Sequence, residues 1–164
     1  MTNIKLRPAV PSDLETVLAL NQAEAKWTSN LSASDLAQLA ELADFFVVAE
    51  HQGHVVGFVL VMTDTSAYDN ANLRWFGDRF MDFWYVDRIV VAKSMAGAGL
   101  GRMIYEHCAE GAKAAGKTSV VCEYSTQPMN EASAAFHARM GFCEVGSRVD
   151  ATNNKHLSMQ RWVF

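Results

Sequence analysis

Residues 83–102 read FWYVDRIVVAKSMAGAGLGR, the part of the chain with the clearest structural pattern. Its first half, Phe83 to Val91, is rich in aromatic and β-branched residues, which favour a buried strand. Three glycines then follow as every second residue, at Gly97, Gly99 and Gly101. The pattern predicts a strand followed by a glycine-rich turn.

The turn is expected to open a helix over about residues 100–115, because the apolar residues there share one face and Gly116 suits the position after the last turn. The opening turn of a helix leaves N–H groups unpaired and carries partial positive charge. Glycines let the backbone approach an anion closely. Arg102 opposes the helix dipole, and a phosphate partner would explain that charge. The order of strand, turn and helix therefore predicts a phosphate-binding loop.

Other interpretations of the glycines stay open at this point. A P-loop requires Lys followed by Ser or Thr, and neither pair follows these glycines. A dinucleotide fingerprint has its third glycine where this chain has Arg102, and it needs an acidic residue about 20 positions on, for which Glu123 is roughly placed. The antiparallel hairpin expected before the strand argues against that fold. A structural turn with no ligand is also compatible with the glycines alone.

The remaining elements follow from periodicity and turn residues. They are a strand at 4–7, a helix opened by a capping box at Ser12 to Glu15, a helix capped by Ser32 or Ser34, a hairpin of strands at 45–49 and 55–62, a long loop over 63–81 that could include a helical turn, a strand at 119–124, a helix over 130–140 closed by Gly141, and two last strands around Asn153-Asn154. The order β-α-α-β-β-β-α-β-α-β-β predicts an α+β or mixed α/β layer with one sheet and about four helices.

Composition narrows the function classes. A length of 164 residues predicts one domain over residues 1–164, and a formal charge of −4 argues against nucleic-acid binding. The longest apolar stretch, Val55 to Met62, is too short for a membrane span, and the amino terminus lacks the apolar core of a signal peptide. Cys108, Cys122 and Cys143 lack metal-ligand spacing. We therefore expect a cytoplasmic protein with free thiols and no metal, membrane or nucleic-acid partner.

Two blocks of the sequence resemble the GNAT superfamily of N-acetyltransferases. Asp87 to Val91 followed by Ala96 to Arg102 looks like the family's acetyl-CoA signature, usually written Q/R-x-x-G-x-G/A. The run NEASAAFHARMGF, from Asn130 to Phe142, looks like the family's second block. One departure is Ala96, which stands where the family usually has Gln or Arg. It removes a side-chain contact to the pyrophosphate and leaves the backbone contacts.

The resemblance implies an acyl-CoA N-acyltransferase fold with a central, mostly antiparallel sheet of about seven strands, and acetyl-CoA (coenzyme A) as the cofactor. In similar enzymes the fourth and fifth strands splay apart, and the pantetheine arm lies in the gap. An amide near Val91 would polarise the thioester carbonyl, and Asn130 could bond the arm, cap its helix, or both. The implied cofactor-binding residues are Ile89, Val90, Val91, Ala96, Gly97, Ala98, Gly99, Leu100, Gly101, Arg102, Asn130, Ser133 and Phe136.

The implied reaction is direct attack of an amine on the thioester in a ternary complex, which requires a base and an acid. His137 occupies the position where many relatives carry a Tyr that serves as the general acid, and an unperturbed imidazole has a pKa near neutral pH. A packing role for His137 is the alternative. Asp87 and Glu123 are carboxylates inside predicted strands, where burial is costly unless the group is paired or useful. Either could act as the base, and solvent is the alternative.

The implied acceptor is an amine of a small molecule, an amino acid or a protein. In similar folds the first two helices and the loop at 63–81 form the acceptor site. The substrate-binding candidates are Asn21, Glu24, Trp27, Tyr68, Asn70, Trp75 and Phe76. Trp75 and Phe76 could instead anchor the loop by packing. Many relatives dimerise through their last strands, so a homodimer stays open. A non-catalytic acyl-CoA-binding or sensing module and a protein–protein scaffold are the alternative functions.

Overall fold

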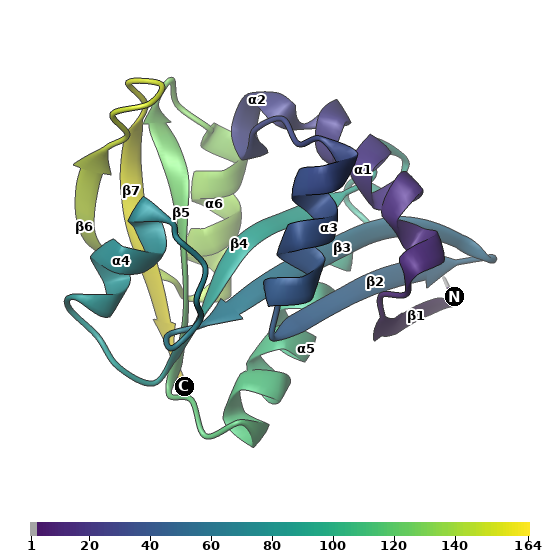
Figure 1. Cartoon of the computed structure of the whole chain (residues 1–164), viewed down its shortest axis with the longest axis horizontal. Helices are drawn as coiled ribbons and strands as arrows, with labels where there is room; N and C mark the ends of the chain where they lie inside the picture. The colour runs from purple at the N-terminus through teal and green to yellow at the C-terminus, as the bar shows by residue number, and fades with distance from the viewer. Residues whose placement is uncertain (1–2) are drawn as a thin grey trace.

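The computed structural model describes residues 3–164, and the sheet formed by these residues has seven strands in the order β1-β2-β3-β4-β5-β7-β6 (Figure 1). The strands are β1 (Ile4–Pro8), β2 (Phe45–His51), β3 (His54–Thr63), β4 (Phe83–Val91), β5 (Ser119–Gln127), β6 (Cys143–Val149) and β7 (His156–Val163). All neighbouring strands are antiparallel except β4 and β5. The mixed α+β fold and the mostly antiparallel sheet are confirmed.

Six α-helices occur within the described part of the chain, two more than the four expected. They are α1 (Leu14–Ala23), α2 (Ala25–Thr28), α3 (Ala33–Leu42), α4 (Ala71–Gly77), α5 (Leu100–Ala114) and α6 (Glu131–Met140). The additional helices, α2 and α4, are short. Asn70 caps α4, because its side-chain oxygen accepts hydrogen bonds from the N–H groups of Asn72 (2.9 Å) and Leu73 (3.1 Å). The segment predicted as a long loop therefore contains a helix that is held at a defined place.

The start of α1 corrects the predicted capping box. Ser12 lies inside a 3₁₀ turn over Pro11–Asp13 and does not cap α1. The carboxylate of Asp13 instead accepts a hydrogen bond from the N–H of Val10 (2.8 Å) and pairs with Arg7 of β1 (2.7 Å). The Arg7 guanidinium holds the pKa of Asp13 below its usual value. Asp13 lies three positions after Val10, so this hydrogen bond is local in the sequence. The ion pair between Asp13 and Arg7 of β1 is a tertiary contact.

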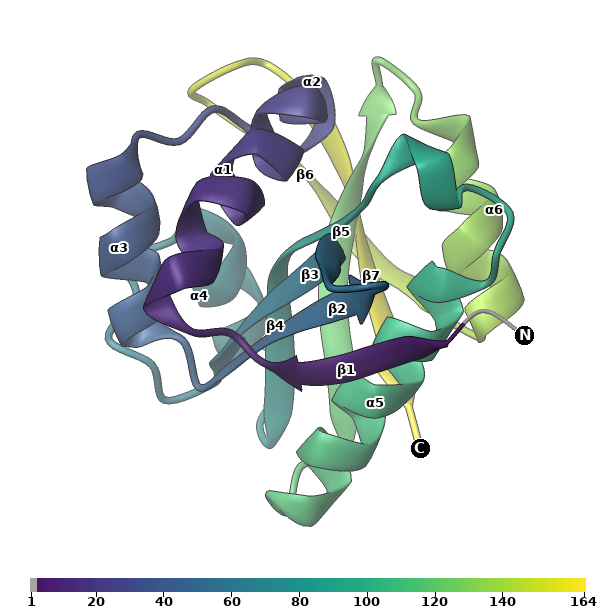
Figure 2. The same ribbon diagram turned by 90° about the vertical axis from the view of Figure 1, so that its right-hand side faces the viewer.

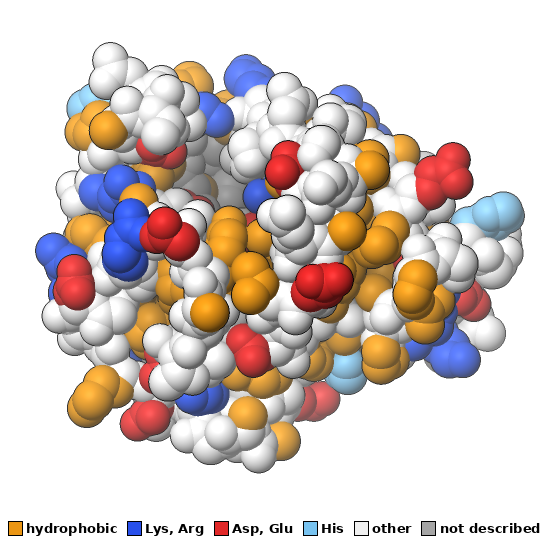
Figure 3. Space-filling model, viewed as in Figure 1, with side chains coloured by type: hydrophobic (Ala, Val, Ile, Leu, Met, Phe, Trp, Pro, Cys, Tyr) orange, Lys and Arg blue, Asp and Glu red, His pale blue; other side chains and the backbone are white. Residues whose placement is uncertain are grey.

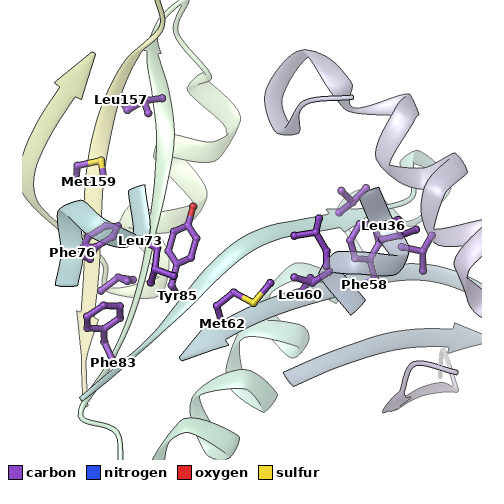
Figure 4. Close-up of a cluster of buried hydrophobic side chains, with 14 of the residues drawn as sticks. Leu36, Phe58, Leu60, Met62, Leu73, Phe76, Phe83, Tyr85, Leu157 and Met159 are labelled. Atoms are coloured by element: carbon purple, nitrogen blue, oxygen red, sulfur yellow. The ribbon is translucent and has the colours of Figure 1, made fainter. Parts of the chain in front are cut away.

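Both faces of the sheet are covered, so two buried clusters form. One cluster lies on the side of α1, α3 and α4 and includes Phe58, Leu60 and Phe76 (Figure 4). The other lies on the side of α5 and includes Val59 and Val61. Successive β3 residues alternate between the clusters, which explains why the strand is apolar at nearly every position. Figure 2 shows the helices on the two sides of the sheet.

The sheet opens between β4 and β5, as the family resemblance implied. The two parallel strands pair only from Phe83↔Ser119 to Tyr85↔Val121. Beyond Tyr85 they diverge, and α6 lies beside the widening gap (Figures 1 and 2). The carboxyl-terminal half of β4 therefore has an edge that no strand covers.

Three further expectations from the sequence concern the described residues. No helix within residues 3–164 is long and apolar enough to span a bilayer, and no cluster of His, Cys, Asp and Glu there could hold a metal ion. Cys108 and Cys122 are buried free thiols, whereas Cys143 is exposed. Burial raises the pKa of Cys108 to about 12 and that of Cys122 further, so neither thiol is a ready nucleophile.

Candidate active site

The glycine-rich turn is exposed and carries unpaired backbone donors. Ala96 donates its N–H to Lys93, and Ala98 donates to Met95. Gly97 and the first residues of α5 have no backbone or side-chain hydrogen-bond acceptor among residues 3–164. The N–H groups left free in this way belong to Gly97, Gly99, Leu100, Gly101 and Arg102. The first turn of any helix leaves such donors, and here they lie next to an exposed glycine-rich turn that adds the N–H of Gly97 to the cluster.

Backbone conformation explains two of the three glycines. Gly97 and Gly99 both have φ +77°, and a Cβ on either would meet no protein atom within 4 Å. The space in front of them is therefore open toward solvent, as an anion site requires. Gly101 has another reason, because a Cβ there would lie 3.3 Å from the ring of Phe136. Arg102 is exposed and pairs with Glu106 (2.7 Å), one helical turn away.

The free edge of β4 presents alternate backbone groups. Ala92 donates its N–H to Val56 of β3 (2.8 Å), so this residue and Val90 direct their backbone groups toward β3. Ile89 and Val91 then direct theirs toward the gap beside β5. Of the three β4 residues predicted to bind the cofactor, Val90 faces away from the gap and is buried. The geometry favours Ile89 and Val91 for backbone contacts.

A cavity of about 340 Å³ lies where β4 and β5 diverge. Its walls come from α2, the segment before α4, both strands, the start of α6 and the loop between β6 and β7. In Figure 3 the surface is hollowed between α2 and the β6–β7 loop. The cavity brings together Asp87, Glu123 and His137, the three residues predicted to act in catalysis.

Glu123 has the most distinctive environment in the cavity. Its Oε1 accepts hydrogen bonds from Asn72 (2.9 Å) and Tyr85 (3.0 Å), which come from α4 and β4. Its Oε2 is buried and has no partner within residues 3–164, although the residue as a whole is partly exposed. Burial, with the Asp87 charge adding to it, raises the pKa of Glu123 to about 8. One fixed oxygen and one free oxygen make this carboxylate available for proton transfer.

Asp87 differs from Glu123 because both of its oxygens are occupied. Tyr68 donates to one oxygen (3.1 Å) and Arg88 to the other (2.8 Å). A β-bulge explains how adjacent residues can pair. In the β3–β4 register Leu60 pairs with Arg88 but Val61 pairs with Val86, which leaves Asp87 as the additional residue. Asp87 therefore orders the cavity wall, and unlike Glu123 it has no oxygen without a hydrogen bond.

His137 is buried and bonded at both ring nitrogens. Its Nδ1 lies 2.7 Å from the carbonyl oxygen of Ser133, which can only accept, so Nδ1 carries the proton. Nε2 then accepts a hydrogen bond from the Tyr105 hydroxyl (2.9 Å). Burial lowers the pKa of His137. A neutral ring with this tautomer directs no proton into the cavity, in contrast to the predicted acid. The ring stacks on Tyr124, which also lines the cavity.

The α6 residues predicted to contact the cofactor also have structural roles. Asn130 caps α6 by accepting a hydrogen bond from the Ser133 N–H (3.2 Å). Its side-chain amide makes no hydrogen bond to the described residues and lines the cavity, so capping and ligand contact are compatible. Ser133 contacts His137, and Phe136 packs on Gly101 and Tyr105.

The acceptor candidates separate into three groups. Trp27, Tyr68 and Asn70 line the cavity. Asn21 is fully buried behind it, and Glu24 lies 4.0 Å from Lys93 near the glycine-rich turn. Trp75 and Phe76 point elsewhere: Phe76 is fully buried in the core, and Trp75 packs against that core and beneath Arg79. The packing alternative therefore describes Trp75 and Phe76 better than the binding one.

Several cavity residues were missed from the sequence. They are Asn72, Tyr85, Arg88, Tyr105 and Tyr124, and Arg148, just outside this lining, was missed as well. Arg148 donates to the Asn72 side-chain oxygen, so it supports the residue that holds Glu123. Asn72 lies 51 positions from Glu123 and 76 positions from Arg148, and no local pattern connects them. Arg88 inside the apolar strand Phe83–Val91 was the one signal available in the sequence, since a buried Arg requires partners.

A splayed sheet with a donor-rich loop at the head of a helix defines the class of acyl-CoA-dependent acyltransferases. Residues 14–142 match the family described as the acetyltransferase (GNAT) family. The chain belongs to this family and is an N-acetyltransferase that uses acetyl-CoA. No curated protein matches its sequence significantly.

Solved structures share the fold at low sequence identity. Ard1 from Thermoplasma volcanium is 16% identical with a TM-score of 0.79, over 98% of this chain and 97% of that one. The ribosomal-protein-S18-alanine N-acetyltransferase from Escherichia coli is 16% identical with a TM-score of 0.73, over 98% and 93%. The yncA protein of Salmonella typhimurium, solved with its cofactor acetyl-CoA, is 20% identical with a TM-score of 0.74, over 99% and 94%.

Proposed function

We propose that this single acetyltransferase domain moves an acetyl group to an amine by direct attack in a ternary complex, with Glu123 as the general base. The acceptor is a small molecule, an amino acid or a protein amino group. The observation that carries the proposal is the unpartnered, buried Oε2 of Glu123 in the cavity at the opening of the sheet.

The chain's residues fit acetyl-CoA. The free N–H groups of the turn, from Gly97 to Arg102, would hold the pyrophosphate, and the open edge at Ile89 and Val91 would bond the pantetheine arm. When bound, acetyl-CoA supplies an activated acetyl thioester. In this proposal the Val91 N–H donates to the thioester carbonyl oxygen, a kind of contact worth about 3–4 kcal/mol in other enzymes.

Glu123 would remove the proton that the amine must lose. A general base works best when its pKa lies near the working pH, and the pKa of Glu123 is about 8. Asn72 and Tyr85 hold Oε1, so the carboxylate keeps one orientation while Oε2 accepts the proton. Asp87 is bonded at both oxygens and supports the wall.

Tyr124 would protonate the departing thiolate. It follows Glu123 on β5, so its side chain lies on the other face of the strand, against His137. Tyr124 lines the cavity, and its hydroxyl makes no hydrogen bond to the described residues. His137, held by Ser133 and Tyr105, would then position this ring.

The direct test is an amine panel with acetyl-CoA, read by thiol release. Turnover on any amine supports the transferase mechanism. Binding of coenzyme A with no turnover on amino acids, polyamines, aminoglycosides or peptides would favour a sensing module, the function that Ala96 and the missing α6 Tyr first suggested.

Replacing Asn72 with Ala should move the pH–rate midpoint of kcat upward by about one unit. Asn72 donates to the Glu123 carboxylate, which favours its charged form, and a hydrogen bond to a charged group is worth about 1.5 kcal/mol or more. Tyr85→Phe removes a donor to the same oxygen and should move the midpoint in the same direction. Exposed Asn3→Ala is the control. An unmoved midpoint in both site variants would mean that another group titrates.

Replacing Tyr124 with Phe should lower kcat by about 10²-fold, the lower range for loss of a general acid. The ring that stacks on His137 is retained, so the melting temperature and the KM for acetyl-CoA should change little. His137→Gln is the comparison. If that variant lost as much kcat while Tyr124→Phe stayed active, the imidazole would be the acid.

A further inference from the structure

Arg88 is a buried cation that the proposed reaction does not use. Its side chain is only 6% exposed. Nε donates to Asp87 (2.8 Å) and Nη1 donates to Asn21 of α1 (2.9 Å). Nη2 has no hydrogen-bond partner within residues 3–164.

The free nitrogen faces the cavity. Among the described residues, Glu123 Oε2 is the one polar side-chain atom that is both buried and unpartnered. Arg88 Nη2 also lacks a partner, so it must retain contact with solvent. The residue is only 7% exposed and lines the cavity, so its remaining contact with solvent is assigned to that side. Nη2 therefore presents two N–H donors to whatever enters the cavity.

The guanidinium is held in place before any ligand binds. Asn21 is fully buried and donates its own amide to the Ser29 carbonyl (2.8 Å), just after α2. Asp87 is fixed by Tyr68. Arg88 thus spans β4 and α1 through two immobilised partners. A cation with spare, preoriented N–H donors is a site for an anion, and a charge-assisted hydrogen bond from such a donor to a carboxylate is strong.

Two unpartnered groups of opposite type therefore line one cavity. Glu123 Oε2 accepts, which suits an amine, and Arg88 Nη2 donates, which suits an anion. We propose that the acceptor is an amine that also carries a carboxylate, as free amino acids do, and that Arg88 anchors this carboxylate. The inference rests on the proposed function, because it assumes that the amine lies at Glu123. A protein amino terminus lacks this carboxylate.

The contact should appear as selectivity between acceptors. A site built around a charged donor rejects analogues that leave it unpaired, by 10²-fold or more in related cases. For wild-type protein, kcat/KM for an accepted amino acid should exceed that for its carboxamide and its decarboxylated amine by at least about 100-fold. Leucine, leucinamide and isoamylamine form one such set, and phenylalanine, phenylalaninamide and phenethylamine form another.

The experiment measures thiol release from acetyl-CoA with the standard L-amino acids, their carboxamides, their decarboxylated amines and short peptides. Preference for the free amino acids supports the inference. Equal or better use of the amines, carboxamides or peptides would overturn it and leave the proposed function intact. If no compound is acetylated although coenzyme A binds, the proposed function itself fails, and the inference fails with it.

Arg88→Gln provides the matching protein change. The preference for the amino acid over its decarboxylated amine should fall to within about threefold. Acetyl-CoA should still raise the melting temperature of the variant, which shows that the variant is folded. Exposed Arg139→Gln on α6 removes the same charge elsewhere and should keep the preference. An Arg88→Gln protein that folds and retains a 100-fold preference would contradict the anchor. If it does not fold, the wild-type comparison decides alone.

Discussion

Replacing Glu123 with Gln is expected to lower kcat by about 10²- to 10⁴-fold, the usual range for loss of a general base. Gln preserves the shape and can still accept a hydrogen bond from Tyr85, but it cannot take a proton. The wild-type kcat should rise with pH up to about 8, where Glu123 ionises, and the variant should lack this rise. Both are measured by thiol release from pH 6 to 9.

Glu110→Gln is the matched control, because this glutamate is exposed on α5. It should retain wild-type kcat and pH dependence. A Glu123→Gln protein with kcat within tenfold of wild type would show that solvent or another group accepts the proton.

The same carboxylate should make stability depend on pH. The folded-state pKa of Glu123 is raised from 4.5 to about 8, so between these values the folded protein holds a proton that the unfolded chain releases. Stability from this group is fully present below about pH 4.5 and declines by up to roughly 1.4 kcal/mol per pH unit as pH approaches 8. Glu123→Gln should therefore melt higher than wild type at pH 8, and the difference should shrink toward pH 5.

Replacing Gly99 with Glu is expected to abolish the stabilisation by acetyl-CoA. At 100 times its Kd a ligand stabilises a protein by about 2.7 kcal/mol, which corresponds to roughly 5–10 °C for a chain of this size. A glutamate here would introduce a negative charge into the open space before the free N–H groups, where the pyrophosphate is expected. Thermal melts with and without acetyl-CoA measure the shift.

Gly116→Glu controls for backbone strain. Gly116 also has φ +77° with no protein atom near its would-be Cβ, and it follows the other end of α5. Both variants should lose some stability because a side chain is strained at positive φ. Only Gly99→Glu should lose the acetyl-CoA shift. An intact shift in Gly99→Glu would remove the pyrophosphate from this loop.

The elements of the fold were readable because their signals are local. The strand over Phe83–Val91, the helix from Leu100 and the Asn130 cap each depend on residues within a few positions of one another. Short helices such as α4 were harder, since the Asn70 cap determines where α4 starts while the apolar period over seven residues is weak.

Roles within the site could not be assigned in the same way. Asp87 and Glu123 are both carboxylates in apolar strands, and their sequence contexts do not separate them. The structure does, because the β-bulge pairs Asp87 with Arg88 while α4 brings Asn72 to only one oxygen of Glu123. His137 was placed correctly on α6, but its tautomer is set by the bonds to Ser133 and Tyr105, and Tyr105 belongs to another helix.

Order along the chain was enough to establish the strands and the longer helices, the glycine-rich turn and the acetyl-CoA signature, because hydrogen bonding within helices and turns joins residues that are close in sequence. The opening between β4 and β5, the free oxygen of Glu123 and the spare donors of Arg88 emerged only from the assembled sheet. Those features depend on which distant side chains satisfy a buried polar group, and that is decided by packing between elements rather than by any one segment.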